Sequence, residues 1–298
     1  MWTPEHRSDL DALAAATPLT VGDRRTLLKA ALGAGYAAAA LPIVAQTAIR
    51  TPADGLTAGE VTIDVAGFRM PAYRVAPAGR TGLPVVLVLS EIFGVHEYIA
   101  DTARRFARAG YLAIAPELFV RQGDPSAYGE MARLIAEVIS KVPDAQVMQD
   151  LDATVGWAGA NGGDVTRLGV TGFCWGGRQT WLYAAHQKAV RAGVAWYGRL
   201  VGQVTELTPR HPVDVAAQLH GPVLGLYGAA DAGIPLDTVD RMKAALVAGN
   251  AAARASQFVV YPDAPHAFHA DYRPSFRKEP AEDGWIRCLD WFRRHGVA

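Results

Sequence analysis

The chain has 298 residues, half of them hydrophobic, and its 29 basic residues balance its 29 acidic ones. That length is enough for one large core, and α/β folds commonly reach it as a single domain. Balanced charge argues against nucleic acid as a partner. The two cysteines, Cys174 and Cys288, are too few for a disulfide framework or a cysteine-based zinc site, and we expect neither metal nor cofactor.

The first 45 residues are typical of a targeting segment. Arg24 and Arg25 directly precede an uncharged, mildly apolar run from Ala30 to Ile49. Paired arginines before such a run resemble a bacterial twin-arginine (Tat) signal, and Ala45 supplies the small residue that a cleavage site requires. The alternatives are an uncleaved membrane anchor and an ordinary amphipathic helix. Because alanine and glycine give little transfer free energy, a stable membrane span is disfavoured.

We therefore expect the Tat machinery to export the folded protein to the periplasm, with residues 46–298 as the mature domain. In that domain, strand and helix patterns alternate. The predicted strands are 60–65, 68–75, 83–90, 111–115, 167–171, 193–197, 222–227 and 258–261. The predicted helices are 99–109, 130–140, 145–158, 178–185, 236–247 and 281–294. This alternation predicts one α/β domain with a mostly parallel central sheet and helices on both faces.

The segment Gly172-Phe173-Cys174-Trp175-Gly176-Gly177 matches the nucleophile elbow Gly-x-Nuc-x-Gly, with cysteine at the position usually held by serine. It lies between a predicted strand and a predicted helix, as this motif requires. Glycines are needed at its flanks because the turn is strained and tightly packed. The helix N-terminus directs N–H groups at the sulfur and favours the thiolate. The alternative is a buried structural cysteine beside a chance cluster of glycines.

A thiol nucleophile needs a base, and the base needs an acid to orient it. Asp231 follows predicted strand 222–227, and His266 follows predicted strand 258–261. The chain order nucleophile, acid, histidine is that of α/β-hydrolases, and open α/β sheets place their sites at the carboxyl ends of strands.

Asp263 and His269 are the competing acid and base. His269 lies three residues after His266 and can face the same pocket, but we rank it below His266. The spacing of the two histidines suits a metal, but no third ligand accompanies them. Glu91 directly follows strand 83–90, and a charge at the end of a buried strand is costly unless it is paired or used. The alternative for Glu91 is a solvated loop carboxylate.

Three motifs in this order resemble the dienelactone hydrolase family. They are Glu91-Ile92-Phe93-Gly94, Gly172-Phe173-Cys174-Trp175-Gly176-Gly177 and Pro265-His266-Ala267-Phe268. The likeness extends from about residue 59 to residue 294. It implies an α/β-hydrolase fold and a carboxylic-ester hydrolase of the carboxymethylenebutenolidase type, which opens lactones or esters. The roles implied are Cys174 as nucleophile, Asp231 and His266 as its partners, Glu91 as acceptor of the thiol proton, and the N–H groups of Ile92 and Trp175 as oxyanion hole.

Two features depart from the family pattern. The arginine that holds the substrate carboxylate, expected four residues after the histidine, is Ala270 here. Arg273 or Arg178 would have to replace it, and Phe93 is a candidate for the apolar part of the pocket. The targeting segment is also atypical, since the degradative enzymes work in the cytoplasm. Both departures concern the substrate more than the chemistry.

Three other functions compete with this one. An esterase or thioesterase on the same scaffold would differ only in its substrate. A non-catalytic binding protein with the same fold would usually lack one member of the triad. A thiol redox protein would need a resolving cysteine, but Cys288 lies in the last predicted helix and not in a C-x-x-C pair.

Overall fold

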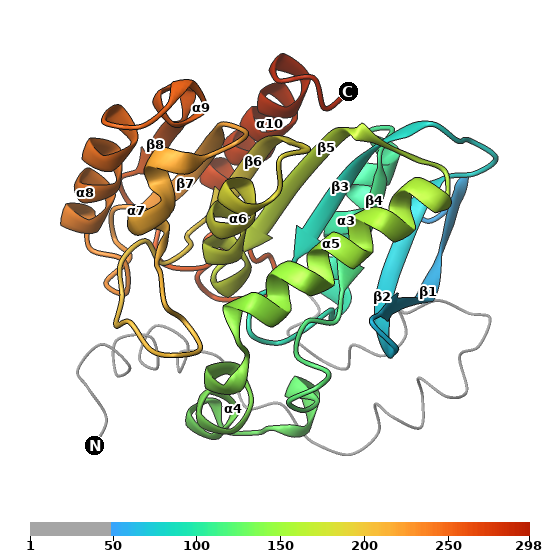
Figure 1. Cartoon of the computed structure of the whole chain (residues 1–298), viewed down its shortest axis with the longest axis horizontal. Helices are drawn as coiled ribbons and strands as arrows, with labels where there is room; N and C mark the ends of the chain where they lie inside the picture. Colours follow the sequence, from blue (N-terminus) through green and yellow to red (C-terminus); the bar gives the residue numbers. More distant parts are fainter. Residues whose placement is uncertain (1–48) are drawn as a thin grey trace.

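The computed structural model describes residues 49–298 and places them around one eight-stranded sheet (Figure 1). The sheet order is β1-β2-β4-β3-β5-β6-β7-β8. The strands are β1 (Leu56–Val65), β2 (Phe68–Pro77), β3 (Leu83–Leu89), β4 (Leu112–Pro116), β5 (Gly163–Phe173), β6 (Val190–Trp196), β7 (Val223–Gly228) and β8 (Gln257–Tyr261). The predicted targeting segment and its predicted cleavage site lie outside the described residues.

Strands β1 and β2 form a hairpin and pair antiparallel, and β2 pairs antiparallel with β4. Every other pair in the sheet is parallel. The hairpin turns at Ala66 and Gly67, which both have positive φ, as a two-residue turn between antiparallel strands requires. The prediction of a mostly parallel α/β sheet is therefore confirmed.

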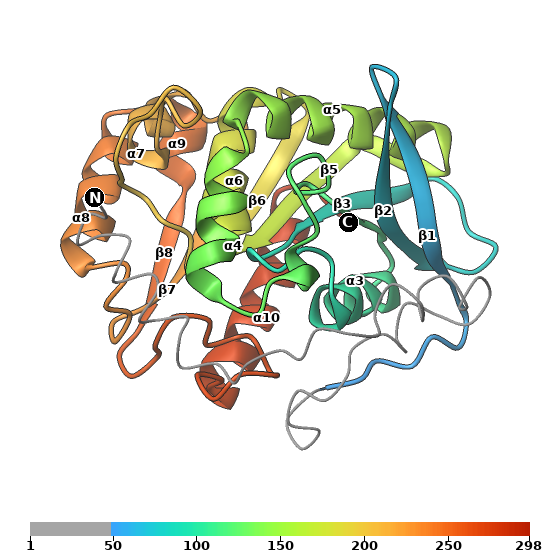
Figure 2. The same ribbon diagram turned by 90° about the horizontal axis from the view of Figure 1, so that it is seen from below.

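Helices cover both faces of the sheet (Figure 2). One face carries α5 (Asp144–Ala160) and α6 (Trp175–His186), and the other carries α3 (Glu97–Arg108) and α10 (Lys278–Arg294). The remaining helices are η2 (Pro125–Ala127), α4 (Met131–Glu137), η3 (Ile139–Lys141), α7 (Pro212–Val215), η4 (Ala216–Gln218), α8 (Leu236–Val247) and α9 (Ala251–Ala255). Among residues 49–298, no helix is long and apolar enough to cross a membrane.

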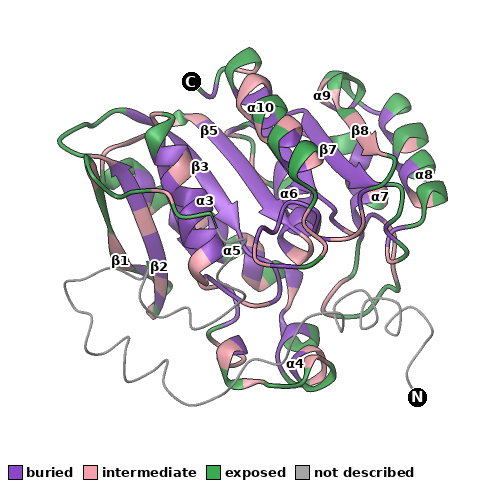
Figure 3. Cartoon of the chain, turned by 180° about the vertical axis from the view of Figure 1, so that it is seen from behind, coloured by how far each residue is buried: buried purple, intermediate pink, exposed green. Residues whose placement is uncertain are grey.

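The central strands are buried from both sides (Figure 3). All seven residues of β3 are buried, because α3 covers one face of this region and α5 and α6 cover the other. A strand that faces apolar side chains on both sides is expected to read as a continuous hydrophobic run, as β3 does. These buried strands fix the positions of the loops that follow their carboxyl ends.

The predicted helix 130–140 is not continuous. It ends at Glu137, and a separate 3-10 turn covers Ile139–Lys141. Between them, Val138 has φ −120° and ψ −65° and is fully buried. Packing of this valine against the interior therefore overrides the helical pattern of the sequence.

Candidate active site

The candidate residues lie in loops at the carboxyl ends of four parallel strands. Glu91 follows β3, Cys174 follows β5, Asp231 follows β7 and His266 follows β8. Because these strands run in the same direction, their carboxyl ends share one edge of the sheet. The structure therefore gathers at one edge four side chains that are separated by up to 175 residues in the sequence.

Cys174 has the strained backbone of a nucleophile elbow. Its φ is 53° and its ψ is −113°, between β5 and the first residue of α6. A Cβ at Gly172 would lie 2.2 Å from the carbonyl oxygen of Gly176, and a Cβ at Gly176 would lie 2.4 Å from the carbonyl oxygen of Leu89. Only glycine fits at either position, so the two flanking glycines allow the helix to approach the strands closely enough to form the turn.

Two backbone N–H groups remain free to bind an oxyanion. The N–H of Trp175 belongs to the first turn of α6 and has no partner inside that helix. The described residues offer the N–H of Ile92 no hydrogen-bond acceptor. Backbone donors of this kind are the usual components of an oxyanion hole.

Asp231 and His266 form a directly bonded pair. Oδ2 of Asp231 lies 2.7 Å from Nδ1 of His266, and Asp231 is almost fully buried. Burial alone would lower the pKa of His266, but the charges and hydrogen bonds of Asp231 and Cys174 raise it from 6.5 to about 10. The partly exposed thiol of Cys174 therefore lies close enough to His266 to interact with its ring.

The competing base, His269, occupies a different environment. It is buried, and its Nδ1 lies 2.6 Å from the hydroxyl of Tyr98. Its ring packs against Trp196 and Phe173, with centroids 4.4 and 5.3 Å away. Burial among these rings holds its pKa well below 6.5. No hydrogen bond joins Asp263 to either histidine in the described part of the chain, so geometry favours Asp231 and His266.

Glu91 is buried and belongs to a second polar group, whose Arg273 interacts with the charges of both Glu91 and Cys174. Its Oε2 accepts a hydrogen bond of 2.6 Å from the hydroxyl of Tyr272 and lies 3.7 Å from Nε2 of His96. Burial raises the pKa of Glu91, but the charge of Arg273 and the contacts with His96 and Tyr272 outweigh it and bring the pKa to about 2. The side chain is therefore a carboxylate, and its buried Oε1 has no hydrogen-bond partner among residues 49–298.

The two arginines weighed for the substrate carboxylate have different places. Arg273 is buried over the ring of Phe93, 4.9 Å from its centroid, and its Nη2 has no hydrogen-bond partner in the part of the chain that the structure describes. Arg178 is instead held by a two-pronged ion pair with Asp144, at 2.6 and 2.8 Å, and by the carbonyl of Arg210. The guanidinium of Arg178 is therefore engaged in joining α6 to α5, whereas Arg273 belongs to the site.

Sequence reasoning missed Tyr272 and His96, which both contact Glu91. No motif marks either residue, although Tyr272 directly precedes the predicted Arg273 and His96 closes the loop that begins at Glu91. Their contacts depend on how the loop after β8 folds over the loop after β3. Only the three-dimensional structure shows this.

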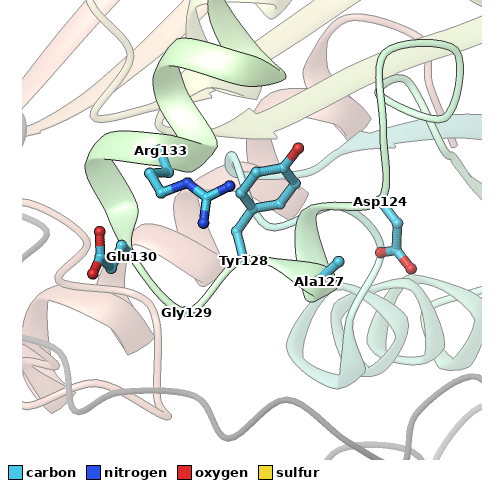
Figure 4. A pocket seen from close by; sticks show the side chains of 6 residues that line it. All are labelled: Asp124, Ala127, Tyr128, Gly129, Glu130 and Arg133. Atoms are coloured by element: carbon cyan, nitrogen blue, oxygen red, sulfur yellow. The ribbon is translucent and has the colours of Figure 1, made fainter.

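A hollow on the η2–α4 segment is lined by Asp124, Ala127, Tyr128, Gly129, Glu130 and Arg133 (Figure 4). None of the candidate catalytic residues lines it. The loop between β4 and η2, which leads into this segment, does contact the site: the Phe119 ring packs 4.7 Å from the ring of Trp175, and Glu117 accepts a hydrogen bond from the N–H of Val95.

A nucleophile elbow and an acid–histidine pair at the carboxyl edge of a mostly parallel sheet define an α/β-hydrolase. Residues 70–296 match the model of the dienelactone hydrolase family. The chain therefore belongs to the dienelactone hydrolase family and is a carboxylic-ester hydrolase.

Known relatives cover nearly all of the chain. A Methylorubrum extorquens protein named "Putative carboxymethylenebutenolidase" is 59% identical over 292 residues, which are 98% of each chain. An Escherichia coli protein with the same name is 53% identical over 88% of this chain and 96% of its own. A crystal structure described as "Putative Dienelactone Hydrolase", from Klebsiella pneumoniae, has a TM-score of 0.79 and 56% identity. It covers 81% of this chain and 100% of that one.

Proposed function

We propose that this hydrolase opens lactones or esters through a cysteine nucleophile and an acyl-thioester. The observation that carries the proposal is the strained elbow at Cys174, whose thiol meets a histidine that Asp231 orients at 2.7 Å. Relatives named after carboxymethylenebutenolidase and dienelactone hydrolase support the same class of substrate.

In the first half of the reaction, the thiolate of Cys174 attacks the carbonyl carbon of the substrate. The carbonyl oxygen becomes an oxyanion in contact with the N–H groups of Ile92 and Trp175, and each such donor typically lowers the barrier by about 3 kcal/mol. Collapse of this intermediate breaks the C–O bond of the ester or ring. The leaving oxygen takes the proton that was removed from the thiol and departs as an alcohol or enol, so His266 is neutral again and the acyl group remains on sulfur.

Two groups can take the thiol proton. His266 is the hydrogen-bond partner of Cys174 in this structure. The carboxylate of Glu91, whose role the family resemblance implies, faces Tyr272 and Arg273 and keeps one unpartnered oxygen. In the second half of the reaction, His266 takes a proton from water, and the resulting hydroxide attacks the thioester. The products are a carboxylic acid and the restored thiol.

Arg273 and Phe93 form the proposed substrate subsite. The unpartnered Nη2 of Arg273 supplies a donor for a substrate carboxylate, and the ring of Phe93 lies under its guanidinium. A dienelactone carries both the carboxylate and the activated ring that suit such a site. A carboxylesterase or thioesterase on the same scaffold is the second candidate function, since the elbow and His266 serve any acyl transfer.

We also propose that residues 1–45 direct export through the Tat machinery and that residues 46–298 act in the periplasm. Arg24 and Arg25 before a mildly apolar run support this proposal. Attachment to the membrane by an uncleaved N-terminus is the alternative location.

The test is ultraviolet-monitored hydrolysis of a dienelactone by the full chain beside its Cys174→Ala variant. Turnover by the parent that is lost in the variant supports both the substrate class and the nucleophile. Cleavage of p-nitrophenyl acetate alone, still dependent on Cys174, keeps the mechanism and discards the dienelactone. Activity that survives in Cys174→Ala overturns the thioester mechanism.

A further inference from the structure

The segment that leads into β1, residues 49–54, is fastened to α3 by charged side chains. Asp101 accepts hydrogen bonds from the backbone N–H and the hydroxyl of Thr51, at 2.5 and 3.2 Å. Nε of Arg104 donates to the carbonyl of Thr51, and Nε of Arg108 donates to the carbonyl of Pro52. Figure 2 shows this leading segment, in blue, passing α3 before it enters the sheet.

The same network of ion pairs extends from α3 to the loop after β8. The carboxylate of Asp101 also accepts a hydrogen bond of 2.7 Å from Nε of Arg105, whose Nη2 donates at 2.6 Å to Asp271. Asp101 and Asp271 are both at least 98% buried. Burial raises the pKa of Asp271, and the charge of Arg105 and a backbone hydrogen bond from Ile49 oppose that rise.

Asp271 directly precedes the residues that hold Glu91. The hydroxyl of Tyr272 donates to Oε2 of Glu91 at 2.6 Å, and Nε of Arg273 donates to the same hydroxyl at 3.1 Å. Breaking a buried ion pair is strongly destabilising, because it leaves the remaining charge buried and unpaired. The ion pair of Asp271 with Arg105 therefore fixes the loop on which Tyr272 and Arg273 lie.

We infer that the leading segment positions Glu91 for catalysis, through a relay that runs from Thr51 to Asp101, Arg105, Asp271 and Tyr272. These relay residues are positioning residues: they do not touch substrate, and they act by holding the carboxylate of Glu91 in one place. This inference rests on the proposed function, since it treats Glu91 as a catalytic group. It makes residues just after the proposed signal part of the working site.

The test uses the full chain and three variants: Asp271→Asn, Thr51→Pro, which removes the N–H and hydroxyl donors to Asp101, and the double variant. We expect Asp271→Asn to lower kcat for p-nitrophenyl acetate about tenfold, with KM within about twofold, because small misplacements of catalytic groups are costly. We expect Thr51→Pro to lower kcat as well. Because both changes break one relay, the double variant resembles Asp271→Asn alone.

A second readout follows the pH dependence of Cys174 alkylation by iodoacetamide, which needs no turnover. The titratable groups that interact with Glu91 are Arg273, Tyr272 and His269 from the loop after β8, His96 before α3, Tyr98 on α3 and Tyr197 after β6. If the relay places Glu91 among them, Asp271→Asn moves the alkylation profile. If the parent chain hydrolyses no ester or lactone, the proposed function is wrong. The alkylation profile would still show whether the relay acts on the site.

Asp290→Asn is the matched control, since its pair with Arg293 on α10 is exposed, and we expect it to leave both readouts unchanged. Arg105→Lys, which keeps the charge but loses the two-pronged geometry, replaces Asp271→Asn if that variant does not fold. Two results would overturn the inference. One is a double variant whose loss equals the product of the single losses, and the other is an alkylation profile that none of the relay variants moves.

Discussion

The hydroxyl of Tyr272 donates a 2.6 Å hydrogen bond to the carboxylate of Glu91, 181 residues earlier in the chain. The bond joins the loop after β8 to the loop after β3. It helps to hold the pKa of Glu91 at about 2, against a burial that would raise it from 4.5. Whether Glu91 is a charged base therefore depends partly on a residue with no motif of its own.

Tyr272→Phe should raise the pKa of Glu91, because burial remains and one stabilising hydrogen bond is lost. The folded pKa lies below the ordinary value, so the charged form is favoured above pH 4.5 and lost as pH falls toward 2. In the variant that loss begins at higher pH, and the acid limb of kcat/KM moves upward. The measurement is a pH–rate profile from pH 3 to 8. Tyr261→Phe, which loses a bond to the half-exposed Asp283, is the control and should leave the limb in place.

The two cysteines should differ sharply in what they contribute. We expect Cys174→Ala to lower kcat/KM by at least about a thousandfold, because no other group at the elbow can form the acyl intermediate. Cys288→Ala changes a fully buried thiol on α10 and should lower stability while sparing kcat. Mass spectrometry after a substrate burst should find the acyl group on Cys174 only. An acyl adduct on another residue would reassign the nucleophile.

Asp231→Asn should destabilise the protein in a pH-dependent way. The pKa of His266 is about 10 in the folded state and 6.5 ordinarily, so pairing adds stability that is complete below pH 6.5 and lost as pH rises through 10. We expect Asp231→Asn to lower the free energy of unfolding by about 2 kcal/mol at pH 6.5. The difference from the parent should shrink toward pH 10. Urea unfolding at both pH values measures it, and a constant difference would show that His266 is not the titrating group.

Much of the fold follows from hydrophobic patterning. The run at β3 and the alternation of strands with helices predict the sheet, and the glycines around Cys174 predict the elbow. Helix α9 was missed although Asn250 precedes it, and the side chain of Asn250 accepts a hydrogen bond from the N–H of Ala253 as an N-cap does. The N-cap residue was therefore visible in the sequence. A helix of five residues is too short to show the hydrophobic periodicity by which helices are predicted.

The sequence predicted the site residues that directly follow strands. It did not predict those whose position depends on contacts between two loops. Cys174, Asp231 and His266 each follow a strand, so topology alone brings them to one edge. The placement of Tyr272 against Glu91 depends on side-chain packing between two loops, which no spacing encodes. For the same reason the sequence left Arg178 and Arg273 as equal candidates, and only the ion pair of Arg178 with Asp144 separates them.

Export can be tested without an assay of activity. Changing Arg24 and Arg25 together to lysine keeps the charge but removes the paired guanidinium groups on which a Tat signal depends. We expect the periplasmic fraction of the full chain to fall to near zero, with the protein retained in the cytoplasm. Fractionation followed by immunoblotting measures it, and Arg50→Lys, after the proposed cleavage site, is the control. Unchanged export of the paired variant would rule out the Tat route.

The elbow should tolerate no side chain at Gly176. A Cβ there would lie 2.4 Å from the carbonyl oxygen of Leu89 and 2.6 Å from that of Ser90, and both obstacles are backbone atoms of the central sheet. Since neither strand nor helix can yield, Gly176→Ala should lower the free energy of unfolding by about 3 kcal/mol. It should also displace the N–H groups that serve the oxyanion, so kcat falls even at temperatures where the variant is folded.

Gly156 supplies the matched comparison for this substitution. It lies on the exposed side of α5, where an added Cβ meets nothing within 4 Å. Gly156→Ala should therefore raise stability by about 0.5–1 kcal/mol, because alanine has the higher helix propensity. Thermal and urea unfolding measure the stability of both variants. Their kcat is measured at a temperature well below both unfolding midpoints. A Gly176→Ala variant as stable and active as the parent would mean that α6 does not approach β3 as closely as the elbow geometry requires.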